Sequence, residues 1–257
     1  MPGMSAAVLR EKLDKVVKPQ IQADAVHLVE TIKRQFPDPE EYVREFAANA
    51  ADAGASRLHI WAGTEQVNGK EHAYIRFDDN GCGMNFDTVD RHYLSLFDSE
   101  KKGAVDPAGR FGLGRVSAWT MQHLCRYLVD TRRGGEETVL DMSAPNTGVI
   151  KRYRTDAADG TTITLYFTTN DCRKKAERLL NSAEKTITRF CRYLACKVLV
   201  TRCDEEGRER VRELTATPED DGWVRMEDGV CEGTTIRYYV RFGKGHGHAH
   251  YFQFFPQ

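Results

Sequence analysis

The sequence predicts an α+β fold in which helices pack on a mixed, mainly antiparallel sheet, as a two-layer α/β sandwich. Segments with the 3.6-residue periodicity of helices are interspersed with short segments rich in β-branched and aromatic residues, which is the pattern of strands. Asn68-Gly69 joins two such strand segments directly, as in an antiparallel hairpin. The 257 residues are enough for one large domain, or for one domain and part of a second.

Helical periodicity predicts helices over residues 6–17 and 21–36. A third helix is expected to begin after Asp38 and to end at Gly54, because glycine favours the left-handed conformation that closes a helix. Further helices are predicted over 87–97, 115–129 and 172–195. Strands are predicted over 57–63, 72–79, 138–142, 150–154, 161–167, 197–202 and 234–242.

The composition is that of an ordinary soluble globular protein, with 40% hydrophobic and 29% charged residues. A formal net charge of −1 predicts no general attraction to anionic membranes or to nucleic acid, so we expect nucleic acid to be contacted only through other domains. No apolar run approaches the roughly 20 residues of a membrane-spanning helix. The seven cysteines form no C-x-x-C pair, which favours free thiols in a reducing cytoplasm.

The third predicted helix carries polar residues within the alanine-rich sequence EFAANAADAGAS. Glu45, Asn49 and Asp52 are spaced so that they lie on one helical face. The small neighbours allow close packing, so we expect this helix to be buried. A buried carboxylate or amide costs free energy unless something pairs with it. The polar stripe therefore either contacts a structural partner or binds a ligand.

Asp79 directly follows a predicted strand in the sequence FDDNGCGM. Gly81 and Gly83 allow the backbone to approach a ligand closely, and the carboxylate suits an exocyclic amino group such as that of adenine. Asp-Asn-Gly is also common turn chemistry. Thr161, in DGTTITLYF, begins a later strand and could hydrogen-bond a base or a water. Taken alone, each of these motifs fits a structural interpretation better: a turn at Asp79 and a strand start at Thr161.

The sequence GRFGLG, with glycines at 109, 112 and 114, precedes a predicted helix. Backbone N–H groups at such a position can bind phosphate. The spacing matches neither a P-loop nor a Rossmann fingerprint. The charged segment 98–114, which contains this motif, is longer than most loops in compact domains, and such loops are usually functional or disordered.

Together, E-x-x-x-N-x-x-D-A, D-x-G-x-G-M, G-x-x-G-x-G and G-T resemble, in order and position, the motifs of the GHKL or Bergerat-fold ATPases. This superfamily includes the ninety-kilodalton heat-shock chaperones, MutL mismatch-repair proteins, type II topoisomerases, MORC ATPases and sensor histidine kinases. NAADAGASRLHI is most similar to the MutL version of the first motif, and GRFGLGRVSAW is more similar to the chaperone version of the third. The resemblance covers roughly residues 20–203 and implies the Bergerat fold.

The resemblance implies that the chain binds ATP with Mg²⁺ and hydrolyses ATP. Asn49 would coordinate Mg²⁺, a hard ion that takes oxygen ligands and keeps several waters. Glu45, one helical turn earlier, would activate the attacking water. Asp52 would support the loop of Asp79 or a water network. Asp79 would accept the adenine amino group, with Thr161 alongside.

The resemblance also assigns residues around the base and phosphates. Met84 would pack on the base, whose approach Gly81 and Gly83 permit. Residues 97–108 would form a lid, from which Lys101 or Lys102 reaches the γ-phosphate. The third motif would hold the phosphates: Gly109, Arg110, Phe111, Gly112, Leu113 and Gly114. Arg110 departs from the chaperones, which usually have glutamine there.

We therefore expect an N-terminal helical segment over 1–20, a GHKL ATP-binding domain over 21–203, and the start of a transducer-like domain or an extension over 204–257. Lid closure, with the helix before Lys18, would build an ATP-dependent homodimer that acts as a chaperone-like or MutL-like clamp. Two alternatives are a histidine kinase catalytic domain and a module that senses nucleotide without hydrolysis. Those kinases usually have lysine where Asp52 stands, and the intact Glu45 disfavours the second alternative. The client is not indicated.

Overall fold

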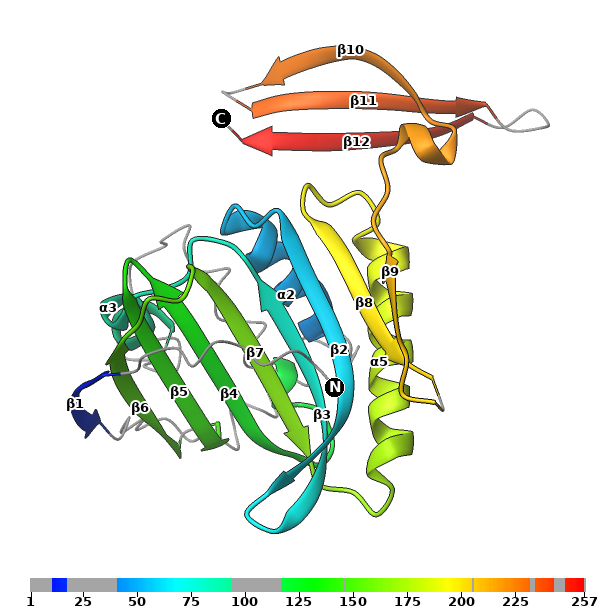
Figure 1. Cartoon of the computed structure of the whole chain (residues 1–257). Coiled ribbons are helices and arrows are strands. Elements are labelled where there is room, and N and C mark those ends of the chain that lie inside the picture. The colour runs from blue at the N-terminus through cyan, green and yellow to red at the C-terminus, as the bar shows by residue number, and fades with distance from the viewer. Residues whose placement is uncertain are drawn as a thin grey trace.

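The computed structural model describes residues 11–17, 41–93, 117–145, 147–204, 206–231, 234–242 and 248–256. Within these ranges the chain forms a nine-stranded sheet and a separate three-stranded sheet (Figure 1). The large sheet has the order β1-β6-β5-β4-β7-β3-β2-β8-β9. Its strands are β1 (Glu11–Val17), β2 (Arg57–Val67), β3 (Lys70–Asp79), β4 (Leu124–Arg133), β5 (Glu136–Ala144), β6 (Thr147–Arg154), β7 (Gly160–Phe167), β8 (Lys197–Cys203) and β9 (Glu209–Glu213).

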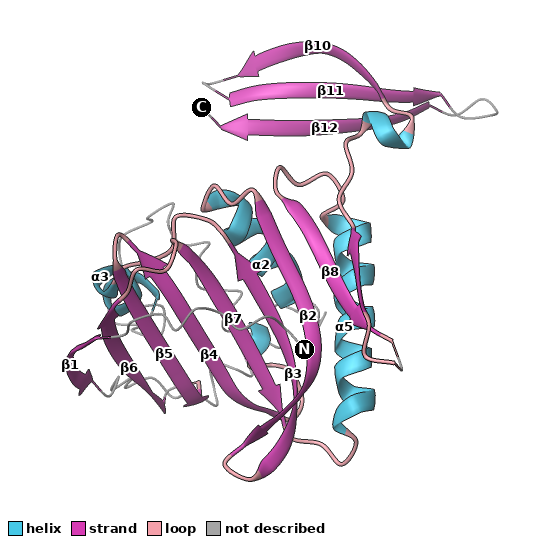
Figure 2. Ribbon diagram, in the orientation of Figure 1, coloured by secondary structure: helices cyan, strands magenta, loops and turns pink. Residues whose placement is uncertain are grey.

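Two long helices, α2 (Glu41–Asp52) and α5 (Cys172–Phe190), pack on the large sheet and on each other (Figure 2). The strands alternate between buried and more exposed residues, so one face of the sheet forms the core beneath the helices. β8 runs parallel to β2, and the other described pairs in the sheet are antiparallel. The predicted α+β sandwich with a mixed, mainly antiparallel sheet is therefore confirmed.

Gly54 ends α2 as its sequence predicts. Its φ of +70° is the left-handed conformation that glycine adopts without steric cost. The Ala55 amide donates to the carbonyl of Ala50 and the Gly54 amide to that of Ala51, each at 3.0 Å, which is the Schellman pattern. Upstream, Tyr42, Val43, Phe46, Ala47 and Ala50 are buried, so α2 is anchored to the core up to its last turn.

The β2–β3 hairpin turns at Asn68 and Gly69, with φ angles of +51° and +77°. Positive φ at both positions is the geometry of a type I′ turn, whose twist matches that of paired strands. The turn fixes the register from Val67 opposite Lys70 to Leu58 opposite Asp79. Local turn chemistry thus determines which residues lie beside one another at the far end of the hairpin.

The expected helix over residues 6–17 is wrong for its described part. Glu11–Val17 form β1, which pairs antiparallel with β6 at the edge of the large sheet. The open edge of β6 has backbone N–H and C=O groups that need partners, and a strand can satisfy them where a helix cannot. Residues 6–10 and the predicted helix over 21–36 lie outside the described residues.

The expected helix over 115–129 is also wrong for most of its length. Only residues 117 and 118 are helical within its described part, and β4 begins at Leu124. His123, in the turn immediately before the strand, has a left-handed φ of +68°. β4 is paired on both sides, with β5 and β7, and buries Tyr127, Val129 and Thr131 in the two-residue period of a strand. The short helix expected over 87–97 appears as α3 (Phe86–Thr88) and a π-helical turn over Val89–Tyr93, with later residues not described.

The three-stranded sheet contains β10 (Val224–Cys231), β11 (Thr234–Phe242) and β12 (His248–Pro256), all antiparallel. A salt bridge connects the segment just after α5 to the short 3-10 turn (Glu219–Asp221) that precedes β10. Arg192 donates to both carboxylate oxygens of Asp221, at 2.5 and 2.7 Å, and the Tyr193 hydroxyl donates to Asp221 at 2.8 Å. The Trp223 indole donates to Tyr193 at 3.0 Å. The domain boundary at residue 203 stays a prediction, and β9, beyond it, pairs with β8.

No helix in the described residues is long and apolar enough to cross a membrane. The cysteines of the described side chains are free thiols: Cys82, Cys125, Cys172, Cys191, Cys196 and Cys203.

Candidate functional site

A cavity of about 230 Å³ lies between the C-terminal half of α2 and the adjoining ends of β2, β3 and β7. The loop after β3 and the end of β4 complete its wall. Cavities of this kind, largely apolar with a few polar groups, are typical small-molecule sites. The lining residues are Phe46, Asn49, Asp52, Ala53, Leu58, Phe77, Asp79, Cys82, Gly83, Met84, Thr88, Arg133, Thr161 and Ile163.

Strand register brings Asp79 and Thr161 together. The two residues are directly opposite in the β3–β7 ladder, and Phe77 is opposite Ile163 two positions earlier. Because side chains alternate along a strand, these four point to the same face of the sheet. On the other side of β3, Leu58 is the partner of Asp79. The carboxylate and the hydroxyl therefore lie beside an apolar floor.

The Asp79 carboxyl is held in place by the backbone of its own loop. The Gly81 amide donates to Asp79 Oδ1 at 2.8 Å. Burial raises the pKa of Asp79 to about 6, because the charged form loses its hydration, while the Gly81 hydrogen bond lowers it. A carboxylate with a raised pKa in a cavity gains most from a ligand that donates a hydrogen bond.

The loop that follows β3 is bound to the end of α2. The Cys82 amide donates to the carbonyl of Ala53 at 2.9 Å. The Asn80 side chain accepts from the Arg57 amide at 2.9 Å and donates to Ser56 Oγ at 2.8 Å. The first two sequence motifs therefore form one connected unit around the cavity.

Three glycines allow this loop to lie against its neighbours. A Cβ at Gly81 would lie 2.7 Å from the Cβ of Ala53. Gly83 has a φ of +59°, and its Cβ would lie 2.0 Å from the carbonyl oxygen of Arg132 in β4. At Gly160 a Cβ would lie 2.4 Å from the carbonyl oxygen of Asp79. The glycines are thus required by backbone packing around the cavity, in addition to any role in ligand approach.

Only two of the three polar residues on the α2 stripe line the cavity. Asn49 and Asp52 line the cavity, and Asp52 is exposed. Glu45 lies one turn before Asn49, is half-buried, and is not among the cavity-lining residues. A ligand that extends from the cavity along α2 would pass Asn49 before it reached Glu45.

Of the predicted site residues, Asn49, Asp52, Asp79, Gly83, Met84 and Thr161 line the cavity, and Gly81 packs behind it. The other predicted residues lie outside the described part of the chain: Lys101, Lys102, Gly109, Arg110, Phe111, Gly112, Leu113 and Gly114.

The sequence interpretation missed the apolar floor and one buried hydroxyl. Phe46, Leu58, Phe77 and Ile163 looked like ordinary core residues, and only the pairing of their strands shows that they surround a cavity. Thr131 follows the helix expected over 115–129 and was assigned to no element. The alternation of buried residues along β4 was the available signal for it.

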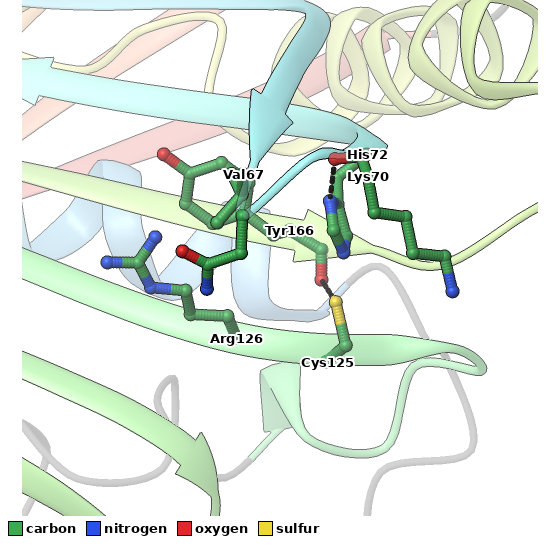
Figure 3. A pocket seen from close by; sticks show the side chains of 7 residues that line it. Val67, Lys70, His72, Cys125, Arg126 and Tyr166 are labelled. Atoms are coloured by element: carbon green, nitrogen blue, oxygen red, sulfur yellow. Dashed lines mark hydrogen bonds between the residues drawn. The ribbon is translucent and has the colours of Figure 1, made fainter.

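A second cavity, of about 340 Å³, opens at the opposite end of β3 (Figure 3). Several of its polar groups already have protein partners, inside or outside the cavity. Arg126 donates to both oxygens of Asp141 at 2.7 and 2.9 Å, and Cys125 donates to the carbonyl of Tyr166 at 3.2 Å. The Lys70 side chain extends away from Arg126 (Figure 3). These groups do not converge on a common point, in contrast to those of the first cavity.

Comparison with known proteins identifies the family of the part of the chain that contains the first cavity. The chain matches the family of histidine kinase-, DNA gyrase B- and HSP90-like ATPases over residues 38–177, which is more than half of its length. The match spans α2, the loop after β3, and β7, and so contains every residue that lines the cavity. No curated protein matches the chain. The chain belongs to the histidine kinase-, DNA gyrase B- and HSP90-like ATPase family and contains a GHKL-type ATP-binding domain.

Proposed function

We propose that the chain hydrolyses ATP in a Mg²⁺-dependent reaction, with the adenine bound by Asp79. The observation that carries this proposal is the carboxyl group of Asp79 in an apolar cavity, opposite Thr161 in the β3–β7 ladder. Apolar walls suit the faces of a purine, and a carboxylate accepts strongly from an exocyclic amino group. Phe46, Leu58 and Ile163 supply apolar contacts to the base.

Asn49 is positioned to bind the metal ion. It lines the same cavity as Asp79, and its amide oxygen is a ligand type that Mg²⁺ accepts. The ion, when bound with the phosphates, supplies charge neutralisation for phosphoryl transfer. The protein's own contribution is to hold the phosphates beside α2, from which Glu45 then holds and deprotonates a water.

Nucleotide binding is proposed to close the segment 97–108 over the γ-phosphate, with Lys101 or Lys102 and the backbone of 109–114 contacting phosphate. Closure would then promote dimerisation, as in a chaperone-like or MutL-like clamp. The described residues 11–17 form an edge strand, so the proposed dimer surface no longer includes a helix at that position. Residues 204–257, with the three-stranded sheet, would be the beginning of a transducer-like unit.

The decisive experiment separates nucleotide binding from hydrolysis. ATP and ADP affinity is measured by calorimetry with and without Mg²⁺, and turnover by phosphate release. Glu45→Gln should retain nucleotide affinity and lose about 10²–10⁴-fold in turnover, the usual effect of removing a general base. Asn49→Ala should instead lose the Mg²⁺-dependent part of ATP binding.

Glu41→Gln is the matched control, because Glu41 is a carboxylate on the same helix, one turn earlier, in an ion pair with Arg44. This variant should hydrolyse ATP at the wild-type rate. Wild-type turnover by Glu45→Gln would remove Glu45 from the mechanism. Absence of ATP binding by the wild-type chain would overturn the proposed function itself.

A further inference from the structure

Thr131 of β4 contacts both halves of the base-binding end of the cavity through one hydroxyl group. Its Oγ1 accepts from the Met84 amide at 2.8 Å. The same oxygen lies 3.0 Å from Thr161 Oγ1 and 3.4 Å from the carbonyl oxygen of Gly160. Met84 belongs to the loop after β3, and the other two residues begin β7. One side chain thus connects the second and fourth sequence motifs.

Because Thr131 is buried, its hydroxyl can hydrogen-bond only with neighbouring protein groups. The residue is 0% exposed, so no water competes for its hydroxyl. Its single hydrogen can be donated to the Gly160 carbonyl or to Thr161 Oγ1, and in the former case Thr161 can donate to Thr131 Oγ1 instead; both partners lie at the start of β7. One of the two lone pairs of Thr131 Oγ1 accepts from the Met84 amide. Whichever way the hydroxyl rotates, it holds the loop after β3 against the start of β7.

The backbone around Thr131 leaves little room for the loop after β3 to move. Gly83 already lies so close to β4 that a Cβ there would overlap the carbonyl oxygen of Arg132. If the half-buried Met84 amide lost its partner, it would remain unpaired in this crowded position, which costs free energy wherever water cannot replace the lost acceptor. The loop would then shift, and both Met84 and Thr161 line the cavity.

We propose that Thr131 is a positioning residue for base recognition, acting through Met84 and Thr161 without touching the nucleotide. This inference rests on the proposed function of the cavity as an adenine nucleotide site. It assigns Thr131 to the binding of the base and not to hydrolysis, because its hydroxyl contacts Met84, Gly160 and Thr161, whereas Glu45 and Asn49 lie on α2.

The test compares Thr131→Val with Thr131→Ser. Valine keeps the volume and removes the hydroxyl, whereas serine retains it. Thr131→Val should weaken ADP and ATP binding by the same factor, about three- to tenfold, as expected for loss of a buried hydrogen bond. In hydrolysis it should raise KM and leave kcat unchanged, because uniform binding is lost. Amide hydrogen exchange at Met84 should accelerate. Thr131→Ser should restore all three.

Thr138→Val is the matched control. Thr138 is directly opposite Thr131 in the β4–β5 ladder and is equally buried, at 0% exposure. Its Oγ1 has no hydrogen-bond partner among the described residues. The variant should leave ADP affinity and Met84 exchange unchanged. If Thr131→Val does not fold, Thr131→Cys replaces it, because a thiol of similar volume is a weaker donor and acceptor.

A double-mutant cycle with Thr161→Val tests whether Thr131 acts through its neighbour. The two changes should be non-additive, since they remove one shared interaction. Wild-type ADP affinity in Thr131→Val, or a fall in kcat at constant KM, would overturn the positioning role while ATP binding by the wild-type chain still stood. If the wild-type chain binds neither ADP nor ATP, the proposed function fails first, and the role of Thr131 with it.

Discussion

The amide nitrogen of Cys82 donates a 2.9 Å hydrogen bond to the carbonyl oxygen of Ala53. This bond joins the loop after β3 to the residue that follows α2. Next to it, Gly81 lies so close to Ala53 that no side chain fits between them. We therefore expect that a change which displaces the base-binding loop also displaces the polar helix α2 and impairs binding by both.

Gly81→Ala should disrupt this contact. The new Cβ would lie 2.7 Å from Ala53 Cβ and 2.9 Å from Ala53 O, so the backbone must shift. We expect a loss of about 1–3 kcal/mol in the free energy of unfolding, as for overpacking elsewhere, together with weaker ATP binding. Urea denaturation and calorimetry measure the two effects.

Gly207→Ala is the control for Gly81→Ala. Gly207 has a φ of +76° and open space around its Cβ position, and it lies between β8 and β9, outside the cavity. The variant should cost about 1 kcal/mol through backbone strain and leave ATP affinity unchanged. Normal ATP affinity in a folded Gly81→Ala chain would contradict the proposed coupling of loop and helix.

Adenosine affinity should depend on pH through Asp79. Burial raises the pKa of this carboxyl to about 6, and the adenine amino group favours its charged form. Affinity should be constant above about pH 7 and fall by up to about tenfold per pH unit below about pH 6. Adenosine is the right probe because phosphate groups titrate in the same range. A similar profile in Asp79→Asn would assign the pH dependence to another group.

Asp79→Asn should also stabilise the free protein near neutral pH. The pKa of Asp79 is about 6 in the folded state, above its ordinary value of 3.8. Between these two pH values the folded state therefore binds more protons than the unfolded state. Stability from this group is therefore greatest below about pH 4 and falls as pH rises through about 6. The variant should be about 1–3 kcal/mol more stable than the wild type at pH 8, and the difference should vanish near pH 4.

Urea denaturation at the two pH values measures this difference. Asp90→Asn, at an exposed carboxyl in the turn after α3, is the control and should change the free energy of unfolding by no more than about 0.5 kcal/mol. Equal stability of Asp79→Asn and wild type at pH 8 would show that burial of the charged Asp79 carboxylate does not destabilise the folded protein.

Asp221→Asn should loosen the connection between α5 and the three-stranded sheet. The Arg192 hydrogen bonds lower the pKa of Asp221 to about 2, so the charged pair is present above about pH 4 and is lost as pH falls towards 2. We expect faster chymotrypsin cleavage after Leu214 or Trp223, with ADP affinity unchanged. Asp228→Asn, which breaks the exposed pair with Arg225 within the small sheet, should not accelerate this cleavage. Equal cleavage rates in the two variants would contradict the prediction.

The proposed lid should distinguish ligands that differ by one phosphate. A non-hydrolysable ATP analogue should protect residues 97–114 from proteolysis and promote dimers in sedimentation, whereas ADP should do neither well. A ligand can favour the closed state only through its extra affinity for that state. Equal protection by the two nucleotides would contradict a switch that depends on the γ-phosphate.

Local chemistry determined much of this fold from the sequence. Gly54 ends α2, and Asn68-Gly69 forms the turn of the β2–β3 hairpin. These residue types favour positive φ angles by themselves, without contacts to distant parts of the chain. The place of Asp79 at the end of a strand, and of Asn49 and Asp52 on one helical face, follows from periods of two and 3.6 residues. These features carried the resemblance that the family match bears out.

Tertiary structure decided what periodicity could not. β1 and the part of β4 up to Val129 were expected to be helical, but β1 satisfies the open edge of β6, and β4 is paired on both sides between β5 and β7. Thr131 and the apolar floor of the cavity became visible only once strand register placed them beside Asp79 and Thr161. Hydrogen bonding between distant segments outweighs the small free-energy differences between local conformations, so the partners of a strand determine its structure and its neighbours.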